Sequence, residues 1–235
     1  MDKIYVEEVR TGKVKELGKA GAENPIDRKW TTAMFKEKRE GKIWVSKTGL
    51  ISDEVADTKA HGGPEKALFA YPSVHYEYWQ RTLDNDDITN GGMGENLVME
   101  SANEFNTFIG DTYRLGEAII QVSQPRQPCW KPARRFGVMD LALQIQQTGY
   151  TGWYYRVLEE GYIETGELKL LDCPNPEWSI QACNEVMHVD KDNLRRTRDL
   201  ASCPELAINW RKRLERRLRG QESSIESRVY GPNKE

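Results

Sequence analysis

Cys129 lies in a loop whose composition favours a reactive thiolate. The segment at 124–135 reads Gln-Pro-Arg-Gln-Pro-Cys-Trp-Lys-Pro-Ala-Arg-Arg, in which three prolines restrict the backbone and four side chains are cationic. Nearby positive charge lowers the pKa of a thiol, and the thiolate is the form that attacks electrophiles or binds soft metals. We therefore interpret Cys129 as a nucleophile or a metal ligand. A half-buried cysteine beside a solvated basic turn is the competing interpretation.

Other kinds of cysteine site fit the sequence less well. Cys129, Cys173, Cys183 and Cys203 lie far apart, so reduced thiols are expected in place of a disulfide framework. A zinc site is disfavoured because the chain has no C-x-x-C pair and its ligand-type residues are scattered. A protease-type Cys/His pair stays open, because spacing alone does not place a histidine beside the sulfur.

Three short glycine-containing segments could approach or bind a ligand. A His-Gly-Gly segment precedes an apolar stretch; its glycines allow close backbone approach, and an imidazole transfers protons near neutral pH. A Lys-Thr-Gly segment could bind phosphate, although it lacks the preceding glycine of a Walker loop. A Gly-Glu-Asn segment opens a further apolar stretch. Each segment taken singly is equally an ordinary turn. The candidate residues in these segments are Lys47, Thr48, His61, Gly62, Gly63 and Asn96.

The elements that must position these residues are mostly short strands. Six β-prone segments separated by glycine and polar turns predict a barrel, which would remove exposed sheet edges. They span 3–9, 43–46, 67–71, 95–99, 118–123 and 167–171. A hairpin is expected over 162–170, with Thr165 and Gly166 at its tip. Helical spacing over 72–80 and 140–147 adds two helices to this body.

The hydrophobic period changes after Trp178. Helical spacing behind Ser179 and behind Asp190 predicts two short helices, and Ser202-Cys203-Pro204-Glu205 has capping-box spacing that would open a third. In this third helix Trp210, Leu214 and Leu218 form one stripe, with Arg211, Arg213, Arg216, Arg217 and Arg219 on other faces. The expected organisation is a body at 1–175, a three-helix domain at 176–220 and a flexible C-terminal tail at 221–235.

Composition limits the environment and the partners. With 30% charged residues, no long apolar run and an N-terminal segment of alternating character, the chain shows neither a membrane span nor a secretory signal, so a cytoplasmic protein is expected. The net charge is −3, but residues 178–235 carry 12 lysines and arginines against 9 aspartates and glutamates. A solvated helix face explains this bias better than nucleic-acid binding does. A homodimer is compatible with the sequence.

The motifs occur in a specific combination and order. Lys-Thr-Gly at 47–49, His-Gly-Gly at 61–63, Gly-Glu-Asn-Leu at 94–97 and Arg-Gln-Pro-Cys-Trp-Lys at 126–131 together resemble the MOSC family, and within it the YiiM-type bacterial proteins. The family is named for the C-terminal domain of molybdenum-cofactor sulfurases. The segment from Pro176 to Arg211 also resembles the three-helix domain of that subgroup. The resemblance implies an α+β fold, a MOSC β-barrel-like domain followed by a small C-terminal three-helix domain.

The resemblance also implies an activity. Such proteins carry a pterin-based molybdenum cofactor (molybdopterin), held through a cysteine that corresponds to Cys129, and reduce N-hydroxylated compounds including 6-N-hydroxylaminopurine. His61 would be a proton donor or substrate contact. Residues expected at the cofactor are Lys47, Thr48, Gly62, Gly63, Asn96, Arg126 and Lys131. The arginine that precedes the asparagine in amidoxime-reducing relatives is replaced here by Gly94-Glu95.

Two further expectations concern partners and rival functions. The chain lacks the clustered cysteines of a plant-type [2Fe–2S] site, so electrons are expected from a separate redox protein, with the basic third helix as one candidate docking surface. The chief rival to a reductase is a sulfur carrier, in which Cys129 takes up and passes on a persulfide. A non-enzymatic rival is a cofactor-binding or nucleic-acid-associated module.

Overall fold

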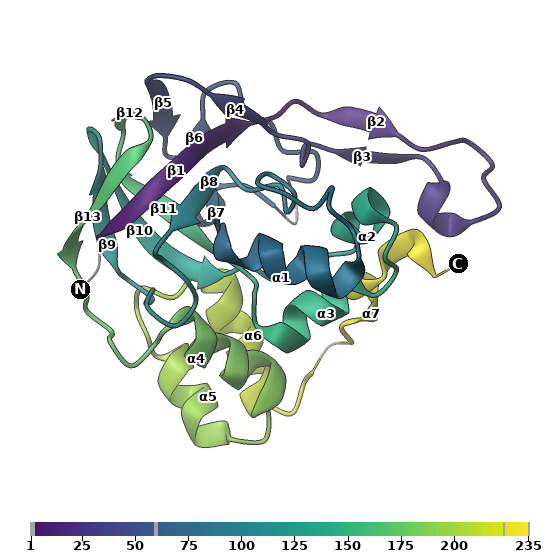
Figure 1. Cartoon of the computed structure of the whole chain (residues 1–235). Coiled ribbons are helices and arrows are strands. Elements are labelled where there is room, and N and C mark those ends of the chain that lie inside the picture. Colours follow the sequence, from purple (N-terminus) through teal and green to yellow (C-terminus); the bar gives the residue numbers. More distant parts are fainter. Residues whose placement is uncertain (1–2, 59–60, 223, 235) are drawn as a thin grey trace.

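A closed barrel forms the body of the molecule. The computed structural model describes residues 3–58, 61–222 and 224–234. Within them, seven strands follow the order β13-β9-β10-β11-β7-β8-β1, and pairing of β1 with β13 closes the ring (Figure 1). Strands β7 and β8 are parallel, and the other neighbours in the ring are antiparallel. The barrel strands are β1 (Ile4–Thr11), β7 (Leu68–Pro72), β8 (Leu97–Glu100), β9 (Thr112–Leu115), β10 (Ala118–Pro125), β11 (Trp153–Glu159) and β13 (Gly166–Asp172).

Shorter strands extend this barrel. β4 (Glu37–Arg39) pairs with β1, and β5 (Ile43–Ser46), β6 (Gly49–Leu50) and β12 (Gly161–Ile163) form a small separate sheet. β2 (Lys15–Leu17) and β3 (Trp30–Thr32) form an arm that projects from the barrel, with the 3-10 turn η1 (Pro25–Asp27) near its tip (Figure 1).

The six predicted strands are all present, but the predicted hairpin is wrong. Each β-prone segment coincides with a strand whose ends differ by a few residues at most. The segment at 162–170 does not fold back on itself, because β12 pairs with β5 while β13 pairs with β1 and β9. β13 closes the barrel by pairing with β1 and β9, and it therefore does not pair with β12, the strand that precedes it in sequence.

Alternating side chains give the barrel two hydrophobic cores. Successive strand residues point to opposite faces. In β7, Leu68 and Ala70 face the core inside the barrel, whereas Phe69 and Tyr71 join a second core outside it. That outer core lies beneath α1 (Val74–Leu83) and α3 (Leu141–Thr148), which confirms the two helices predicted for this body.

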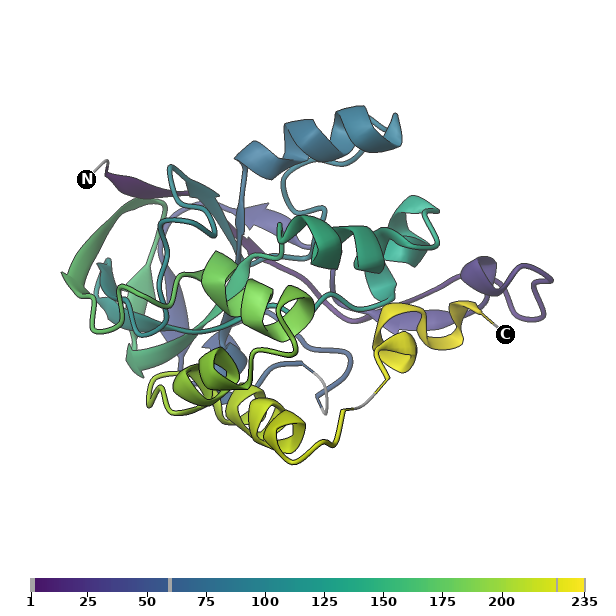
Figure 2. The same ribbon diagram turned by 90° about the horizontal axis from the view of Figure 1, so that it is seen from below.

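The three-helix domain packs beside the barrel, and in Figure 2 α3 lies between it and α1. The domain consists of α4 (Ile180–Asn184), continued by the π-helical turn η3 (Glu185–Val189), then α5 (Leu194–Ala201) and α6 (Ile208–Leu218). Ser179 caps α4 as predicted, accepting from the Ala182 N–H at 3.0 Å. The cap of α5 is Asn193, not Asp190, and α6 begins at Ile208, after the predicted capping box.

Arg217 is buried, contrary to its predicted place on an outer face of α6. The buried side chains of α6 are Trp210, Leu214 and Arg217, and the last is only 7% exposed. Its guanidinium donates to the carbonyls of Val186 and Met187 at 2.6 and 2.7 Å. These carbonyls lie near the end of η3, where a helix leaves acceptors unpaired, so Arg217 ties α6 to the first helix.

The C-terminal segment is structured, although its sequence predicts a mobile tail. It contains α7 (Glu226–Val229) and the short turn η4 (Gly231–Asn233) beside α2 (Lys131–Phe136) (Figures 1 and 2). Val229 and Asn233 are fully buried, and Arg134 of α2 donates to the Asn233 side chain at 2.6 Å. Isolated anchoring residues of this kind produce no hydrophobic period, and the segment was predicted to be mobile because its sequence shows none.

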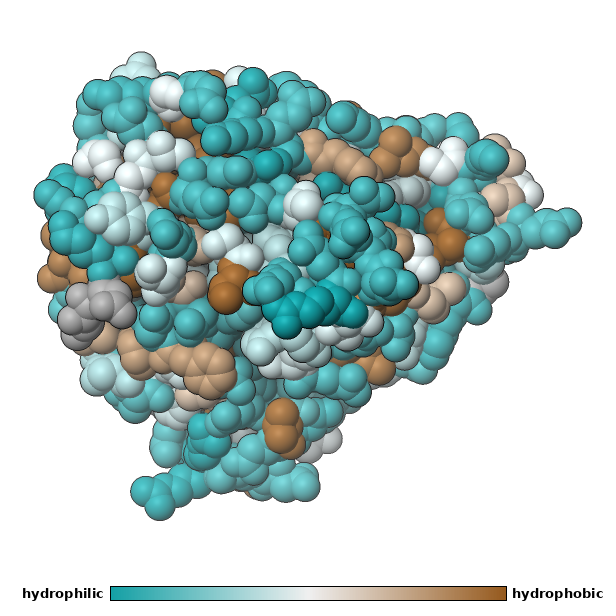
Figure 3. Space-filling view, viewed as in Figure 1, coloured by the Kyte–Doolittle hydropathy of each residue, from teal (hydrophilic) through white to brown (hydrophobic). Residues whose placement is uncertain are grey.

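The surface carries no large apolar face in the view of Figure 3, where hydrophobic residues are scattered among hydrophilic ones. Single exposed apolar side chains such as Phe105 and Val189 are ordinary on a protein surface. None of the helices in the described ranges is both long and apolar enough to cross a membrane.

Candidate functional site

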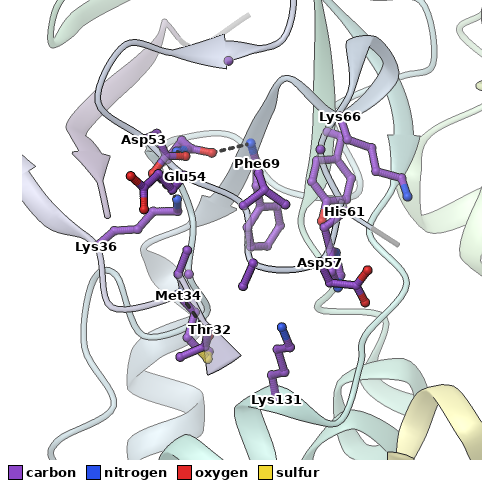
Figure 4. Close-up of a pocket in the computed structure, with 18 of the residues that line it drawn as sticks. Thr32, Met34, Lys36, Asp53, Glu54, Asp57, His61, Lys66, Phe69 and Lys131 are labelled. Carbon is purple, nitrogen blue, oxygen red and sulfur yellow. Dashed lines mark hydrogen bonds and ion pairs between the residues drawn. The ribbon is translucent and has the colours of Figure 1, made fainter. Parts of the chain in front are cut away.

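The predicted site residues meet at a cleft beside the barrel. The cleft encloses about 820 Å³, including the space at its open mouth. In Figure 4, Lys36, Asp53 and Glu54 lie on one side, Asp57, His61 and Lys66 on the other, and Lys131 at the base. Of the nine residues predicted from sequence, those lining the cleft are Thr48, His61, Gly62, Asn96, Arg126, Cys129 and Lys131.

The sulfur of Cys129 is held in surroundings that favour its thiolate. The residue is half-buried between the end of β10 and the start of α2. Burial alone would raise its pKa, but a hydrogen bond with His61 and the positive charges of His61 and Arg126 outweigh that effect. The Lys131 backbone N–H adds a further hydrogen bond, and the pKa falls to about 6 from an ordinary value of 9.0. The predicted Cys129 and His61 are therefore direct neighbours.

Arg126 places an unpartnered donor at the same cleft. The residue is 4% exposed, its guanidinium lies 5.0 Å from the centre of the Phe69 ring, and its backbone N–H donates to the Gly152 carbonyl at 3.0 Å. Its Nη1 atom is buried and has no hydrogen-bond partner among the described residues. A buried cationic donor is costly to leave unpaired, so this atom marks a place for an anionic or acceptor group of a ligand.

Asn96 anchors the opposite wall of the cleft. Its Oδ1 accepts from the Phe69 N–H at 3.1 Å, and its Nδ2 donates to the Arg10 carbonyl at 3.2 Å and to Asp53 Oδ2 at 2.8 Å. Asp53 in turn forms an ion pair with Lys36, and both side chains are nearly buried. Burial lowers the pKa of Lys36, although the Asp53 carboxylate opposes that change. Asn96 thus joins β7 and β8 to a buried ion pair.

Two predicted residues are not part of the cleft lining. The Lys47 ammonium donates to the carbonyls of Val157 and Leu158 in β11, and the Lys47 N–H donates to Glu160 at 2.7 Å. Lys47 therefore fixes the β5–β6 turn to β11. Gly63 precedes the turn η2 (Pro64–Lys66), while its neighbour Gly62 lines the cleft.

A glycine is required at position 62 for a local steric reason. Its φ is +75°, and a Cβ placed there would lie 3.1 Å from the Val55 side chain. A larger side chain would be strained in this conformation and would crowd Val55, so glycine fits position 62 best.

Several cleft residues were missed by sequence reasoning. Lys36, Asp53, Phe69 and Tyr154 all line the cleft but come from segments that carry no recognisable motif. Burial raises the pKa of Tyr154 to about 12, while the charge of Arg126 opposes the rise. The phenol thus keeps its proton and stands as a neutral wall beside Cys129.

The other three cysteines have different surroundings. Burial and a hydrogen bond with Asp111 raise the pKa of Cys173 to about 12, and burial raises the pKa of Cys183 and of Cys203 in the three-helix domain. Among the described residues, no cluster of three or more histidine, cysteine, aspartate or glutamate side chains has the arrangement of a metal site. Cys129 is the cysteine whose surroundings stabilise a thiolate.

Comparison with known proteins assigns the chain to a family. Residues 57–168 match the MOSC domain, and residues 178–221 match the YiiM-like, 3-alpha helix domain. YflK of Bacillus subtilis is 40% identical over 83% of this chain and 88% of its own length. YiiM of Escherichia coli is 35% identical over 85% of this chain and 91% of its own. The chain belongs to the MOSC family. Its C-terminal domain places it with the YiiM-like proteins, as the ordered motifs predicted.

Solved structures and a longer relative agree with this placement. YiiM from Geobacillus stearothermophilus superposes with a TM-score of 0.76 at 33% identity, covering 92% of this chain and 99% of that one. YiiM from Escherichia coli gives the same TM-score at 29% identity, covering 98% and 100%. These structures confirm the MOSC barrel followed by a three-helix domain. A protein of Gibberella moniliformis named "Reductase" is 35% identical over 86% of this chain, which spans 35% of its length.

Proposed function

We propose that this MOSC protein is a molybdenum-cofactor-dependent reductase of N-hydroxylated compounds, with hydroxylamino purines such as 6-N-hydroxylaminopurine as the substrate class. The observation that carries the proposal is the pairing of a low-pKa cysteine with an unpartnered, buried guanidinium nitrogen of Arg126 at one cleft. Membership of the family and the name of the longer relative, "Reductase", support a redox role.

The residues at the cleft fit such a cofactor. A thiolate is the protein donor that a soft metal centre prefers, and Cys129 would supply it. The free Nη1 of Arg126 would bind an anionic or acceptor oxygen of the pterin or its phosphate, and Lys131 adds a cation at the base of the cleft. Thr48 offers a hydroxyl, and Gly62 leaves space for close approach. Asn96 would act by fixing the wall, since its amide is already engaged.

When bound, molybdenum supplies two-electron oxygen-transfer chemistry, and the remaining work falls to the protein. The overall reaction converts R–NHOH, two electrons and two protons into R–NH2 and water. His61 would deliver a proton from its imidazole to the departing oxygen, because it already lies beside Cys129 at the open cleft. Tyr154 and Phe69 would shield the site from bulk water.

Electrons would come from a separate redox protein. The exposed cations of α5 and α6 are the proposed docking surface for an acidic partner, by charge complementarity. Burial removes Arg217 from that surface, so it is composed of Arg195, Arg198, Lys212, Arg216 and Arg219.

The decisive experiment compares the metal content of two cysteine variants. Wild type, Cys129→Ala and Cys173→Ala are purified from a molybdenum-replete host, and molybdenum, pterin and 6-N-hydroxylaminopurine reduction are measured. Stoichiometric molybdenum and activity in wild type and Cys173→Ala, with both lost in Cys129→Ala, support the proposal. Equal molybdenum content in all three proteins would show that Cys129 is not the ligand.

The same thiolate also supports one rival, a sulfur carrier. Cys129 is partly exposed and its thiolate predominates near neutral pH, which is what persulfide uptake requires. Metal-free wild type carrying one extra sulfur atom on Cys129, removable by a reductant, would favour this function over the reductase.

A further inference from the structure

The loop that carries Cys129 is held from outside by the C-terminal segment. The Arg228 guanidinium donates through Nη1 to the carbonyl of Pro128, and the backbone carbonyl of Arg228 accepts from the Trp130 N–H at 2.9 Å. The first carbonyl belongs to the peptide group before Cys129, and the second N–H belongs to the peptide group after it. One residue therefore fixes both peptide planes that flank the Cys129 Cα.

Arg228 is itself held in place. Its Nη2 donates to Gln146 Oε1 of α3 at 2.5 Å, and Gln146 is only 8% exposed. Arg228 thus spans the space between α3 and the cysteine loop. Its positive charge also acts on Cys129, and burial together with the neighbouring Arg213 lowers the Arg228 pKa to about 10, so the guanidinium stays charged at neutral pH.

The rest of the segment closes around Trp130. Asn233 Nδ2 donates to the Trp130 carbonyl at 3.3 Å. Gly231 has a φ of +50°, and a Cβ at that position would lie 2.3 Å from the indole ring, so the backbone lies flat against Trp130. Both contacts are made within five residues of Arg228, and both involve Trp130, the residue after Cys129.

We propose that Arg228 is a positioning residue of the cysteine site, and that the segment 225–233 sets the orientation in which Cys129 presents its sulfur to the cleft. The expected effect of Arg228 on metal binding rests on the proposed function. Its effect on the conformation of the cysteine loop does not, because that effect needs no cofactor. A loop containing Pro128 and Pro132 is stiff, yet prolines do not fix the two torsions of Cys129. The hydrogen bonds from Arg228 do so. Groups that orient a ligand commonly change metal affinity by 10- to 100-fold.

The test uses three variants of the full chain. Arg228→Gln removes the charge and the reach to Pro128, Arg228→Lys keeps a cation and one donor, and Lys234→Gln is the matched control. Lys234 directly follows the segment 225–233, and it contacts Glu226 and Tyr230 instead of the cysteine loop. Thermal unfolding of each variant is recorded.

The first measurement is amide hydrogen exchange in the cofactor-free proteins. We expect exchange over 127–131 to rise by at least about tenfold in Arg228→Gln, to rise less in Arg228→Lys, and to stay at the wild-type rate in Lys234→Gln. Unchanged exchange over this loop would overturn the proposal. So would an equal rise across the barrel strands, since that would reflect a general loss of stability.

The second measurement is molybdenum retained after dialysis of protein purified from a molybdenum-replete host. We expect Arg228→Gln to retain at least about tenfold less metal than wild type, with partial recovery in Arg228→Lys. If Arg228→Gln retained as much molybdenum as wild type, Arg228 would have no effect on metal binding through Cys129. If wild type itself binds no molybdenum while loop exchange still rises in Arg228→Gln, the reductase proposal fails and the positioning role stands.

Discussion

Replacing His61 tests how the Cys129 thiolate is stabilised. In cofactor-free protein the thiol should ionise with a pKa of about 6, against 9.0 for an ordinary cysteine. A difference of three units corresponds to roughly 4 kcal/mol in favour of the thiolate. The His61 hydrogen bond and charge are the largest contributions that lower this pKa, so His61→Ala should raise it by one unit or more, leaving the Arg126 charge and the Lys131 N–H to oppose burial.

The assay is the rate of alkylation by iodoacetamide as a function of pH, followed on Cys129 by mass spectrometry. At pH 7 a thiol is about 90% ionised with a pKa of 6, about 50% with a pKa of 7 and about 1% with a pKa of 9, so His61→Ala should react between about twofold and ninetyfold more slowly. Cys173, whose pKa is raised to about 12, serves as an internal negative control, because its thiol should stay unmodified near neutral pH. An unchanged pH profile in His61→Ala would refute the reasoning.

The lowered pKa of Cys129 should also make the stability of the wild-type protein depend on pH. Because the folded state releases the Cys129 proton at a lower pH than the unfolded chain does, the unfolded chain binds more protons between about pH 6 and 9. The unfolding free energy of the cofactor-free protein should therefore rise with pH in this window. Cys129→Ala should lose that dependence in urea titrations.

Three further predictions follow from buried or exposed charge. Asp53→Asn should lower the unfolding free energy by about 3 kcal/mol in urea titrations, because it leaves the Lys36 cation buried without its carboxylate. Arg126→Gln should reduce bound molybdenum by at least about tenfold by metal analysis, since charge-assisted hydrogen bonds contribute roughly 1.5 to 3 kcal/mol; Arg114→Gln on the exposed face of β9 is its control. Arg216→Glu should weaken reduction supported by an acidic redox protein and flatten its salt dependence.

Each of these predictions can fail in a defined way. Wild-type stability in Asp53→Asn would mean that the buried ion pair is not needed for the cleft wall. Equal molybdenum in the Arg126 and Arg114 variants would remove Arg126 from the cofactor contacts. An unchanged salt dependence in Arg216→Glu would place the donor elsewhere on the surface.

Most strands could be predicted from their apolar residues and flanking turns, but β11 was missed. β10 buries Ala118, Ile120 and Val122 along one face and is recognisable from this pattern. β11 begins with Trp153, Tyr154 and Tyr155, all buried, because neighbouring residues enter the inner and outer cores in turn. Such a strand shows no polar alternation and was missed.

Local spacing likewise revealed only part of the cleft. Arg126, Cys129 and Lys131 are close in sequence, so their chemistry could be read from one loop. Lys36 and Asp53 meet only because the folded chain brings together two segments 17 residues apart. The C-terminal segment was misjudged for the same reason, since its contacts are made with a loop that precedes it by 100 residues.

That long separation gives the segment a role in the order of assembly. During synthesis the cysteine loop and the barrel strands on either side of it emerge well before residues 225–233 do. The peptide groups around Cys129 cannot be fixed by Arg228 until residues 225–233 have left the ribosome. A site of this design reaches its final geometry later than the barrel strands around it, which separates completion of the cysteine loop from any earlier encounter of the nascent chain with metal or pterin.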